Sequence, residues 1–325
     1  MPAHKSHLEL VRAADNFPYI DIARTPYHED EGSAFYQLLL PNDPRPHGYL
    51  LPSTVKKMPW NSHFQITHDA PRTVQVLDSS DGKDIAGAIN RDFSTVIENA
   101  IQSKAFAVLG RPHHEDFKIL GARHPPVQLL RTAASLFGIT CRGAHMTAYQ
   151  NTEEGMKIWV PRRSAHLFTY PNMLDTTVAG GVRAEESPFE CILHEADEEA
   201  SLQADLVREH TRACGVLTYV AQSDAQNGEN YGCMVPDCLY VYDIELPAGV
   251  VPKPRDEEVK EFYLWDVERV KEALVKDEFK TNCAAVMIDF FIRHGIITDE
   301  NEKDYLEIVS RLHRVLPVPT SPTAP

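Results

Sequence analysis

Three glutamates in the second half of the chain have the spacing of a metal site. Glu195, Glu198 and Glu199 follow one another at i, i+3 and i+4, so on a helix their side chains are neighbours. Adjacent carboxylates repel one another, but a divalent cation such as Mg²⁺ or Mn²⁺ offsets this repulsion because it takes oxygen ligands. The spacing therefore indicates a metal site, whereas a pair of adjacent glutamates alone is most often a solvated helix face.

The neighbouring residues predict the helix that would hold these carboxylates. Ser187 and Glu190 form a capping-box pattern, and Pro188 stands at the first helical position, where its missing N–H costs nothing. A helix is therefore expected to begin at residue 188. Its apolar stripe, which would pack on a sheet, consists of Phe189, Ile192, Leu193, Ala196 and Ala200.

Residues 180–202 resemble the signature of the Nudix hydrolase superfamily. Residues that match this signature at the family's spacing are Gly180, Glu186, Glu195, Ala196, Glu198, Glu199 and Leu202. Two positions differ, because His194 stands where the family has arginine and Ser201 where it has glycine. The missing arginine normally pairs with neighbouring carboxylates, so the histidine is expected to affect the rate and its pH dependence.

The resemblance implies the roles of these residues. Glu195, Glu198 and Glu199 would bind Mg²⁺ or Mn²⁺, the Gly180 carbonyl would contribute a ligand, and Glu186 would support the loop. Glu198 and Glu199 would also be catalytic in the attack of water on a diphosphate. The general base varies between Nudix branches: it could be a helix glutamate or an acid in the segment 256–261, where Glu258 is our choice. The alternative for that segment is an exposed charged turn.

Several further segments resemble one Nudix branch in which another domain precedes the Nudix domain. They are 157–164, 170–182, 240–265 and 279–295, and 129–145 resembles the junction. Some fungal members of this branch are fused to a thiamine pyrophosphokinase. The resemblance implies that thiamine diphosphate or its oxidised derivatives are cut to the monophosphate. Oxidised nucleoside diphosphates, ADP-ribose-like compounds and a non-catalytic diphosphate-binding role are the alternatives, because residue chemistry alone indicates only a diphosphate compound.

Other residues are weaker candidates for contacts with a substrate. Arg162 and Arg163 could clamp phosphates with their planar forks, or they could be surface arginines at the end of a strand. Trp159 could stack on an aromatic ring, although core packing is the more common role. The run His113–Asp116 contains metal-binding residue types, but adjacent side chains generally point apart, so a solvated loop is expected there.

Composition limits the class of protein. The chain has 325 residues with a net charge of -15, which argues against general binding to nucleic acids or anionic membranes. It contains no apolar run of about 18 residues and no N-terminal signal pattern, so a cytoplasmic protein is expected, as a monomer or homodimer. The six cysteines are expected to be free thiols rather than disulfides.

The fold class expected is α+β, with a Nudix α/β/α sandwich on a mixed sheet after a smaller α+β domain. We expect the N-terminal domain at 1–140, the Nudix domain at 141–315 and a disordered tail at 316–325. Strands are predicted on either side of a turn at 153–155, at 215–222 and 239–247, and from 258 into a helix. Helices are predicted near the N-terminus and at 92–102, 125–138, 282–294 and 299–315.

Overall fold

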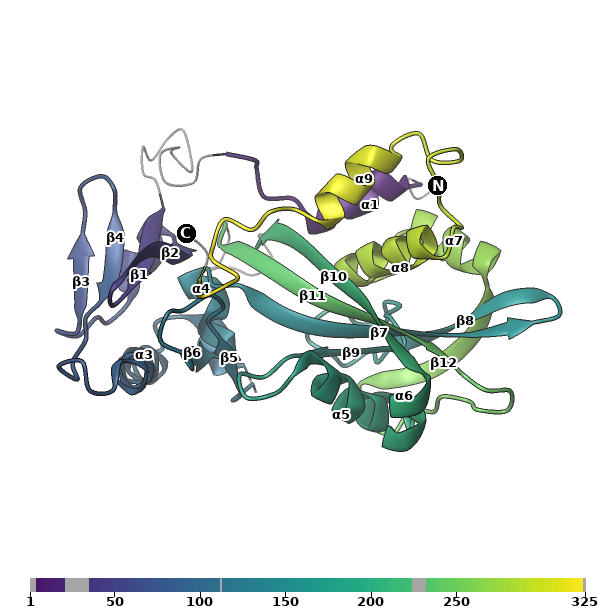
Figure 1. The fold of residues 1–325 in the computed structure, drawn as a ribbon, viewed down its shortest axis with the longest axis horizontal. Coiled ribbons are helices and arrows are strands. Elements are labelled where there is room, and N and C mark those ends of the chain that lie inside the picture. The colour runs from purple at the N-terminus through teal and green to yellow at the C-terminus, as the bar shows by residue number, and fades with distance from the viewer. Residues whose placement is uncertain (1–3, 21–34, 112, 224–231, 324–325) are drawn as a thin grey trace.

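The computed structural model describes residues 4–20, 35–111, 113–223 and 232–323. The polar segment 25–32 lies outside the described residues. Two sheets organise the chain, a four-stranded one in its N-terminal part and a larger one after residue 140 (Figure 1).

The larger sheet has six strands and mixed direction. Its order is β10-β11-β7-β8-β12, and β9 pairs with β7. The strands are β7 (Cys141–Thr152), β8 (Gly155–Arg163), β9 (Val178–Gly181), β10 (Thr211–Gln222), β11 (Met234–Glu245) and β12 (Val259–Asp266). Strands β11 and β7 run parallel, whereas the other pairs are antiparallel. The predicted strand pair around the turn at 153–155 is confirmed.

Helices cover both faces of this sheet (Figure 1). On one face lie α5 (Pro188–Ala200) and α6 (Ala204–His210). On the other lie α1 (His7–Ala14), α7 (Val267–Val275), α8 (Thr281–Arg293) and α9 (Tyr305–Leu312). A separate buried apolar cluster fills each interface between helices and sheet. The predicted α/β/α sandwich with a mixed sheet is therefore confirmed.

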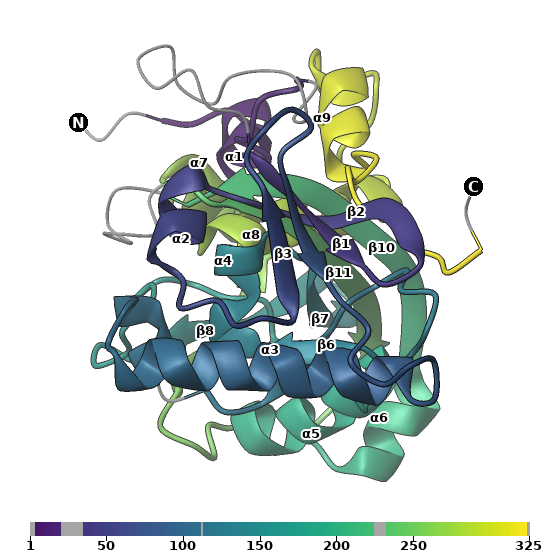
Figure 2. The same cartoon turned by 90° about the vertical axis from the view of Figure 1, so that its left-hand side faces the viewer.

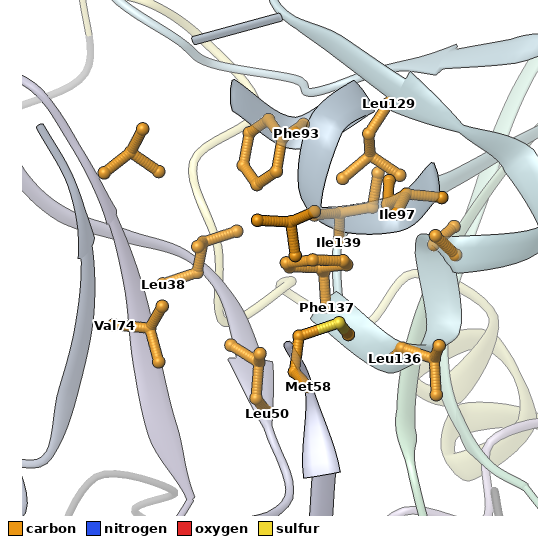
Figure 3. Close-up of a cluster of buried hydrophobic side chains, with 14 of the residues drawn as sticks. Leu38, Leu50, Met58, Val74, Phe93, Ile97, Leu129, Leu136, Phe137 and Ile139 are labelled. Atoms are coloured by element: carbon orange, nitrogen blue, oxygen red, sulfur yellow. The ribbon is translucent and has the colours of Figure 1, made fainter. Parts of the chain in front are cut away.

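The N-terminal part has its own sheet and core. The strands β1 (Tyr36–Leu40), β2 (Asp43–Leu50), β3 (Phe64–Thr67) and β4 (Thr73–Val76) pair in the order β2-β1-β4-β3, and α2 (Pro52–Lys57) follows β2. Helix α3 (Ile85–Gln102) lies across this part of the chain (Figure 2). Its residues Phe93 and Ile97 are buried with Leu38 and Phe137 in one apolar cluster (Figure 3). The ring centroids of Phe93 and Phe137 are 5.3 Å apart, edge to face. This α+β region precedes the Nudix-like sheet, as expected.

Segment 125–138 is not the single helix that its pattern predicts. Pro125 and Pro126 cannot donate backbone hydrogen bonds, and the chain then forms β6 (Gln128–Leu130), which pairs with β5 (Asp116–Lys118). A 3₁₀ turn (Arg131–Ala133) and the short helix α4 (Ala134–Phe137) follow. Gly138 ends α4 in the left-handed conformation with φ 62°, which glycine adopts without a steric penalty.

The two ends of the chain both pack on the protein. Helix α1 packs in the same apolar core as α8 and α9. It therefore packs with elements that follow residue 140, although it precedes the expected domain boundary at that residue. Leu316 and Val318 are buried with Phe17 and Phe35. The expectation of a disordered tail is therefore wrong for residues 316–323, because its apolar side chains have a cluster to join.

The sequence predicts free cysteines and contains no apolar run long enough to span a membrane. All six cysteines are free thiols in the structure. Within the described ranges, no helix is both long enough and apolar enough to span a bilayer.

A buried ion pair joins the two ends of the chain. The Asp15 carboxylate is fully buried and accepts hydrogen bonds from Arg314 at 2.9 Å and Arg311 at 3.0 Å. Arg314 also donates to the carbonyls of Phe17 at 2.7 Å and Pro18 at 2.8 Å. Arg314 therefore satisfies buried acceptors from the N-terminal segment that the apolar contacts alone would leave unpaired.

Replacing this arginine should destabilise the fold. We expect Arg314→Met to lower the free energy of unfolding by about 3 kcal/mol, because it leaves a buried carboxylate short of a partner. Urea denaturation measures the change. Arg91→Met is the matched control, since the ion pair of Arg91 with Asp84 is exposed and should contribute less than about 0.5 kcal/mol. Equal effects of the two substitutions would contradict this account of the chain ends.

Candidate active site

Helix α5 is held in place by its cap and its apolar face. As predicted, it begins at Pro188, with the Ser187 side chain accepting from the Glu190 backbone and the Glu190 carboxylate accepting from the Ser187 N–H at 2.7 Å. Ile192 and Ala196 are completely buried in the cluster against the sheet. The helix is therefore fixed in rotation, and this decides which carboxylates face β9.

The three helix carboxylates differ in their surroundings. Glu199 is buried, with 7% of its surface exposed, and accepts a hydrogen bond from the Ala179 N–H of β9 at 3.0 Å. Glu195 is half-buried and Glu198 is exposed. The acidic cluster thus extends from the sheet to solvent, so a bound ion would be accessible to a substrate.

Gly180 has a steric role that its spacing alone does not reveal. A Cβ at this position would lie 2.1 Å from Oε1 of Glu195 and 2.4 Å from its Cγ. Strand β9 therefore approaches α5 so closely that only glycine fits, and the Glu195 carboxylate lies directly against the backbone of residue 180.

Burial and mutual repulsion make these carboxylates unusual acids. Burial, together with the charges of Glu198 and Glu258, raises the pKa of Glu195 to about 7. Burial also raises the pKa of Glu199 well above its ordinary value, with Glu195 as the next cause. Hard oxygen donors that are desolvated and repel one another fit a divalent cation, because the cation removes the cost of holding both in the charged form.

Glu186, which is expected to support the loop between β9 and α5, makes a hydrogen bond within this loop. Its carboxylate accepts from the Arg183 N–H at 2.7 Å. Nδ1 of His194 lies 3.4 Å from Oε2 of Glu186, so the histidine contacts this carboxylate from the signature position of the arginine. The His194 side chain is 58% exposed.

The backbone conformation at Ser201 is one that favours glycine, the residue that the Nudix signature has at this position. Ser201 ends α5 in the left-handed conformation with φ 53°, which glycine adopts without a steric penalty. Its hydroxyl donates to the carbonyl of Lys253 at 2.9 Å, a contact that glycine could not make.

The segment that contains Glu258 runs along the end of α5. The Lys253 N–H donates to the Ala200 carbonyl at 3.0 Å, and the Asp256 N–H donates to the Glu198 carbonyl at 3.1 Å. Glu258 is exposed, and its charge raises the pKa of both Glu195 and Glu199. The structure thus brings Glu258 near the helix carboxylates, while its role as a base stays a prediction.

The predicted substrate arginines are engaged with protein groups. Arg163 is 11% exposed and donates to the buried carboxylate of Asp175 at 3.0 Å. Arg162 donates to the Tyr263 hydroxyl at 3.1 Å and to the Asn172 carbonyl at 2.8 Å. These contacts favour a structural role for Arg163 and leave Arg162, at 24% exposure, the more accessible of the two.

Trp159 lies in the apolar cluster beneath α5. It is 7% exposed, and within the described part of the chain its buried indole N–H has no hydrogen-bond acceptor. Core packing therefore accounts for the ring. A contact with substrate through the indole edge stays a prediction.

A second group of metal-binding residue types lies deeper than the glutamates. His145, Asp175 and Cys283 are the one such trio in the described ranges whose ligand atoms all lie within 4.8 Å of one another. However, Asp175 already pairs with Arg163 at 3.0 Å and with Lys280 at 3.8 Å. Burial lowers the pKa of His145 to about 4 and raises the pKa of the Cys283 thiol. Two cationic side chains and a protonated thiol oppose a metal ion here, so we interpret the group as an internal ion-pair network.

The N-terminal part supplies residues beside the site that the sequence did not indicate. The Ala184 N–H, in the loop before α5, donates to the Asp116 carbonyl at 2.8 Å. A Cβ at Gly181 would lie 3.0 Å from Cζ of Arg131. The segment His113–Asp116, which was expected to be a solvated loop, thus contacts the loop before α5 through the Asp116 carbonyl. Only the fold brings these residues to the Nudix-like signature, since they lie far from it in sequence.

Two cavities among the described residues lie away from the carboxylate cluster. One of about 420 Å³ is lined by residues that include Gln150, His210 and Pro247, and one of about 640 Å³ is lined by residues that include Cys214 and Asp243. No residue of α5 lines either cavity.

The close approach of β9 and α5 can be tested directly. Gly180→Ala should displace the Glu195 carboxylate and weaken Mn²⁺ binding by about tenfold or more, because it disturbs the orientation of one ligand. Titration of free Mn²⁺ by electron paramagnetic resonance measures this. Gly110→Ala is the control, since a Cβ there meets no atom within 4 Å. Unchanged Mn²⁺ affinity in Gly180→Ala would contradict the placement of the site.

A family model and several known proteins are similar to parts of this chain. A family model described as the NUDIX domain matches residues 142–283. An uncharacterized protein of Saccharomyces cerevisiae is 39% identical over 213 residues, which are 64% of this chain and 62% of the relative. Nudix hydrolase 20, chloroplastic, of Arabidopsis thaliana is 37% identical over 185 residues, 57% of this chain and 47% of the relative. A crystal structure of a Deinococcus radiodurans protein aligns with a TM-score of 0.38 and 20% identity, over 62% of this chain and 100% of that chain.

The chain spans less than two thirds of the length of the curated relatives that it matches. Within that span, the family match begins one residue after the start of β7 and includes β9, α5 and the segment with Glu258. The capped helix, the glycine that Glu195 requires and the matching family model together identify residues 142–283 as a Nudix domain.

Proposed function

We propose that this protein is a divalent-metal-dependent pyrophosphohydrolase that acts on a small-molecule diphosphate. The observation that carries the proposal is the pair Glu195 and Glu199, two largely desolvated carboxylates held against β9 of a Nudix domain. Buried charges of one sign are costly unless a cation compensates them. A divalent metal ion would supply that compensation.

The proposed ligands are Glu195, Glu198, Glu199 and the carbonyl of Gly180, and the proposed ion is Mg²⁺ or Mn²⁺. When bound there, the ion would supply positive charge to the phosphate oxygens and lower the pKa of water. The Ala179 N–H fixes one oxygen of Glu199, and residue 180 fixes the position of Glu195. Two of the ligands are therefore held in place by the protein before any ion binds.

Glu258 is proposed as the general base, and Glu198 and Glu199 as the catalytic helix carboxylates. In the proposed reaction Glu258 takes a proton from water while the water oxygen bonds to one phosphorus. The anhydride P–O bond breaks, and the second phosphate group leaves with that bridging oxygen. The exposed position of Glu258 beside Glu195 supports this assignment, because a base must reach both solvent and the reacting phosphorus.

The proposed substrate is thiamine diphosphate or one of its oxidised derivatives, on the strength of the resemblance in the segments outside the signature. Oxidised nucleoside diphosphates and ADP-ribose are the alternatives within the same chemistry. Arg162 and Trp159 remain the proposed contacts for the substrate, and Arg163 is the weaker candidate because of its pair with Asp175. A cytoplasmic location and a monomer or homodimer complete the proposal, to be tested by fractionation and light scattering.

A non-catalytic diphosphate-binding protein is the second candidate. His194 favours it, because this residue contacts Glu186 where the family has an arginine. Such a protein would bind Mg²⁺ and a diphosphate but would hydrolyse none of the compounds named above.

Glu199→Gln should abolish turnover while the fold persists. We expect the wild-type protein, with Mg²⁺, to release monophosphate from at least one of thiamine diphosphate, its oxidised form, ADP-ribose and oxidised dGDP. The substitution should reduce that rate by at least about 100-fold, because it removes a metal ligand. Asp197→Asn is the matched control on the same helix, since its ion pair with Arg255 lies on the exposed side. No turnover of any compound by the wild-type protein with Mg²⁺ or Mn²⁺ would favour the binding-protein alternative.

Metal affinity should also depend on pH near neutrality. Because the pKa of Glu195 is raised to about 7, the metal-free protein holds a proton there at pH 6 and has largely lost it at pH 8. A metal ion must displace this proton, so Mn²⁺ affinity should fall by up to about tenfold per unit below pH 7. Calorimetric titration with Mn²⁺ at pH 6 and 8 measures the difference in affinity. The substitution Glu195→Gln should make this difference smaller. Equal Mn²⁺ affinity at the two pH values would contradict the assignment of Glu195.

A further inference from the structure

A hairpin of the N-terminal part borders the loop that leads from β9 into α5. Strands β5 and β6 lie beside this loop in Figure 1, and the Asp116 carbonyl accepts the hydrogen bond from Ala184 in it. At the end of the hairpin the Arg131 N–H donates to the Glu115 carbonyl at 2.9 Å. The backbone of Arg131 is therefore fixed relative to the Nudix domain.

The guanidinium of Arg131 occupies space next to Gly181. A Cβ at residue 181 would lie 3.0 Å from Cζ and 3.1 Å from a terminal nitrogen of Arg131. The guanidinium also lies over the ring of Phe117, 5.3 Å from its centroid. Gly180, against which the Glu195 carboxylate lies, is the next residue of the same strand. Successive residues of a strand face opposite sides, so the guanidinium lies at the end of β9 on the face opposite Glu195, and it is linked to the carboxylate cluster by its charge, which acts on Glu195. Arg131 lies outside the residues of the family match.

Glu115 orients this guanidinium. Arg131 donates a hydrogen bond to the Glu115 carboxylate, and Nδ1 of His113 lies 3.6 Å from the same carboxylate. The side chains of Arg131 and Glu115 are 34% and 22% exposed. An arginine has five N–H donors in a rigid fork, so a bond to one carboxylate leaves donors for a second anion.

The charge of Arg131 acts on the proposed metal ligands. It lowers the pKa of Glu195, against the larger effect of burial, and Arg183 acts in the same direction. In a chain with a net charge of -15, two guanidinium groups beside the acidic helix are a local source of positive potential. An anionic group that approaches the cluster from the side of the hairpin meets them first.

We propose that Arg131 is a substrate-binding residue that holds a phosphate group of the diphosphate, and that Glu115 is the residue that positions it. This rests on the proposed function, since it concerns the same site. Arginine binds phosphate oxygens with two parallel hydrogen bonds, and a carboxylate behind the guanidinium fixes its orientation. The N-terminal part then contributes directly to the recognition of substrate. Because Arg131 would contact phosphate, its effect should be similar for diphosphates with different organic groups.

Binding of methylenediphosphonate, a diphosphate analogue with a P–C–P link, tests the proposal without turnover. In calorimetric titrations of the full chain with Mg²⁺ present, we expect Arg131→Ala to weaken binding by roughly 10- to 100-fold. Arg131→Lys, which keeps the charge but loses the fork, should recover part of the affinity. Glu115→Gln should weaken binding less than Arg131→Ala. Arg91→Ala, an exposed arginine of the same N-terminal part, should leave the affinity unchanged.

The outcomes separate this inference from the proposed function. If Arg131→Ala binds Mn²⁺ like the wild-type protein but loses affinity for the diphosphonate, the inference holds even if no compound is hydrolysed. If the wild-type protein hydrolyses a diphosphate and neither Arg131→Ala nor Arg131→Lys changes its KM or the diphosphonate affinity, the inference is overturned and the proposed function stands. Absence of diphosphonate binding by the wild-type protein also overturns it. If Arg131→Ala does not fold, unchanged affinity in both Arg131→Lys and Glu115→Gln overturns it.

Discussion

The contact between strand β9 and helix α5 is the constraint on which the rest of the site depends. Glu195 lies against the backbone of Gly180, and Glu199 accepts the Ala179 N–H. Both carboxylates are thereby taken partly out of water and placed near each other, an arrangement that is unfavourable by itself. Burial of Ile192 and Ala196 on the adjoining stripe of the same helix stabilises this arrangement, because the apolar stripe cannot pack on the sheet without bringing the carboxylates to β9.

Both ends of α5 are fixed by groups outside the helix. At its start the Ser187 and Glu190 cap satisfies N–H groups that have no partner within the helix. At its end the N–H groups of Lys253 and Asp256 satisfy the last carbonyls, in place of water. The segment that satisfies these carbonyls also carries Glu258. A single set of backbone hydrogen bonds therefore stabilises the end of the helix and places a further carboxylate beside Glu195 and Glu199.

Local sequence predicted what depends on local structure. The start of α5 followed from Ser187 and Pro188, and the glycine that Glu195 requires was recognised by its spacing alone, without its steric reason. The residues that sequence missed depend on long-range packing. The segment that includes Glu115 was expected to be a solvated loop because neighbouring side chains point apart. This rule applies only to contacts within the segment. The partner of Glu115 is instead Arg131, which follows β6 and lies opposite Glu115 because β6 pairs with β5.

The distribution of positive charge shows which residues of this acidic protein could face the proposed anionic substrate. Two guanidinium groups act on Glu195, those of Arg131 and Arg183, and neither is a position that the Nudix signature specifies. The position where the signature has arginine carries His194, whose contact is Glu186 at the base of the loop. Positive charge at the acidic cluster therefore comes from the loop and from the N-terminal hairpin. An isolated Nudix domain of this sequence would lack Arg131, so the N-terminal part completes the electrostatics of the site as well as adding to its surface.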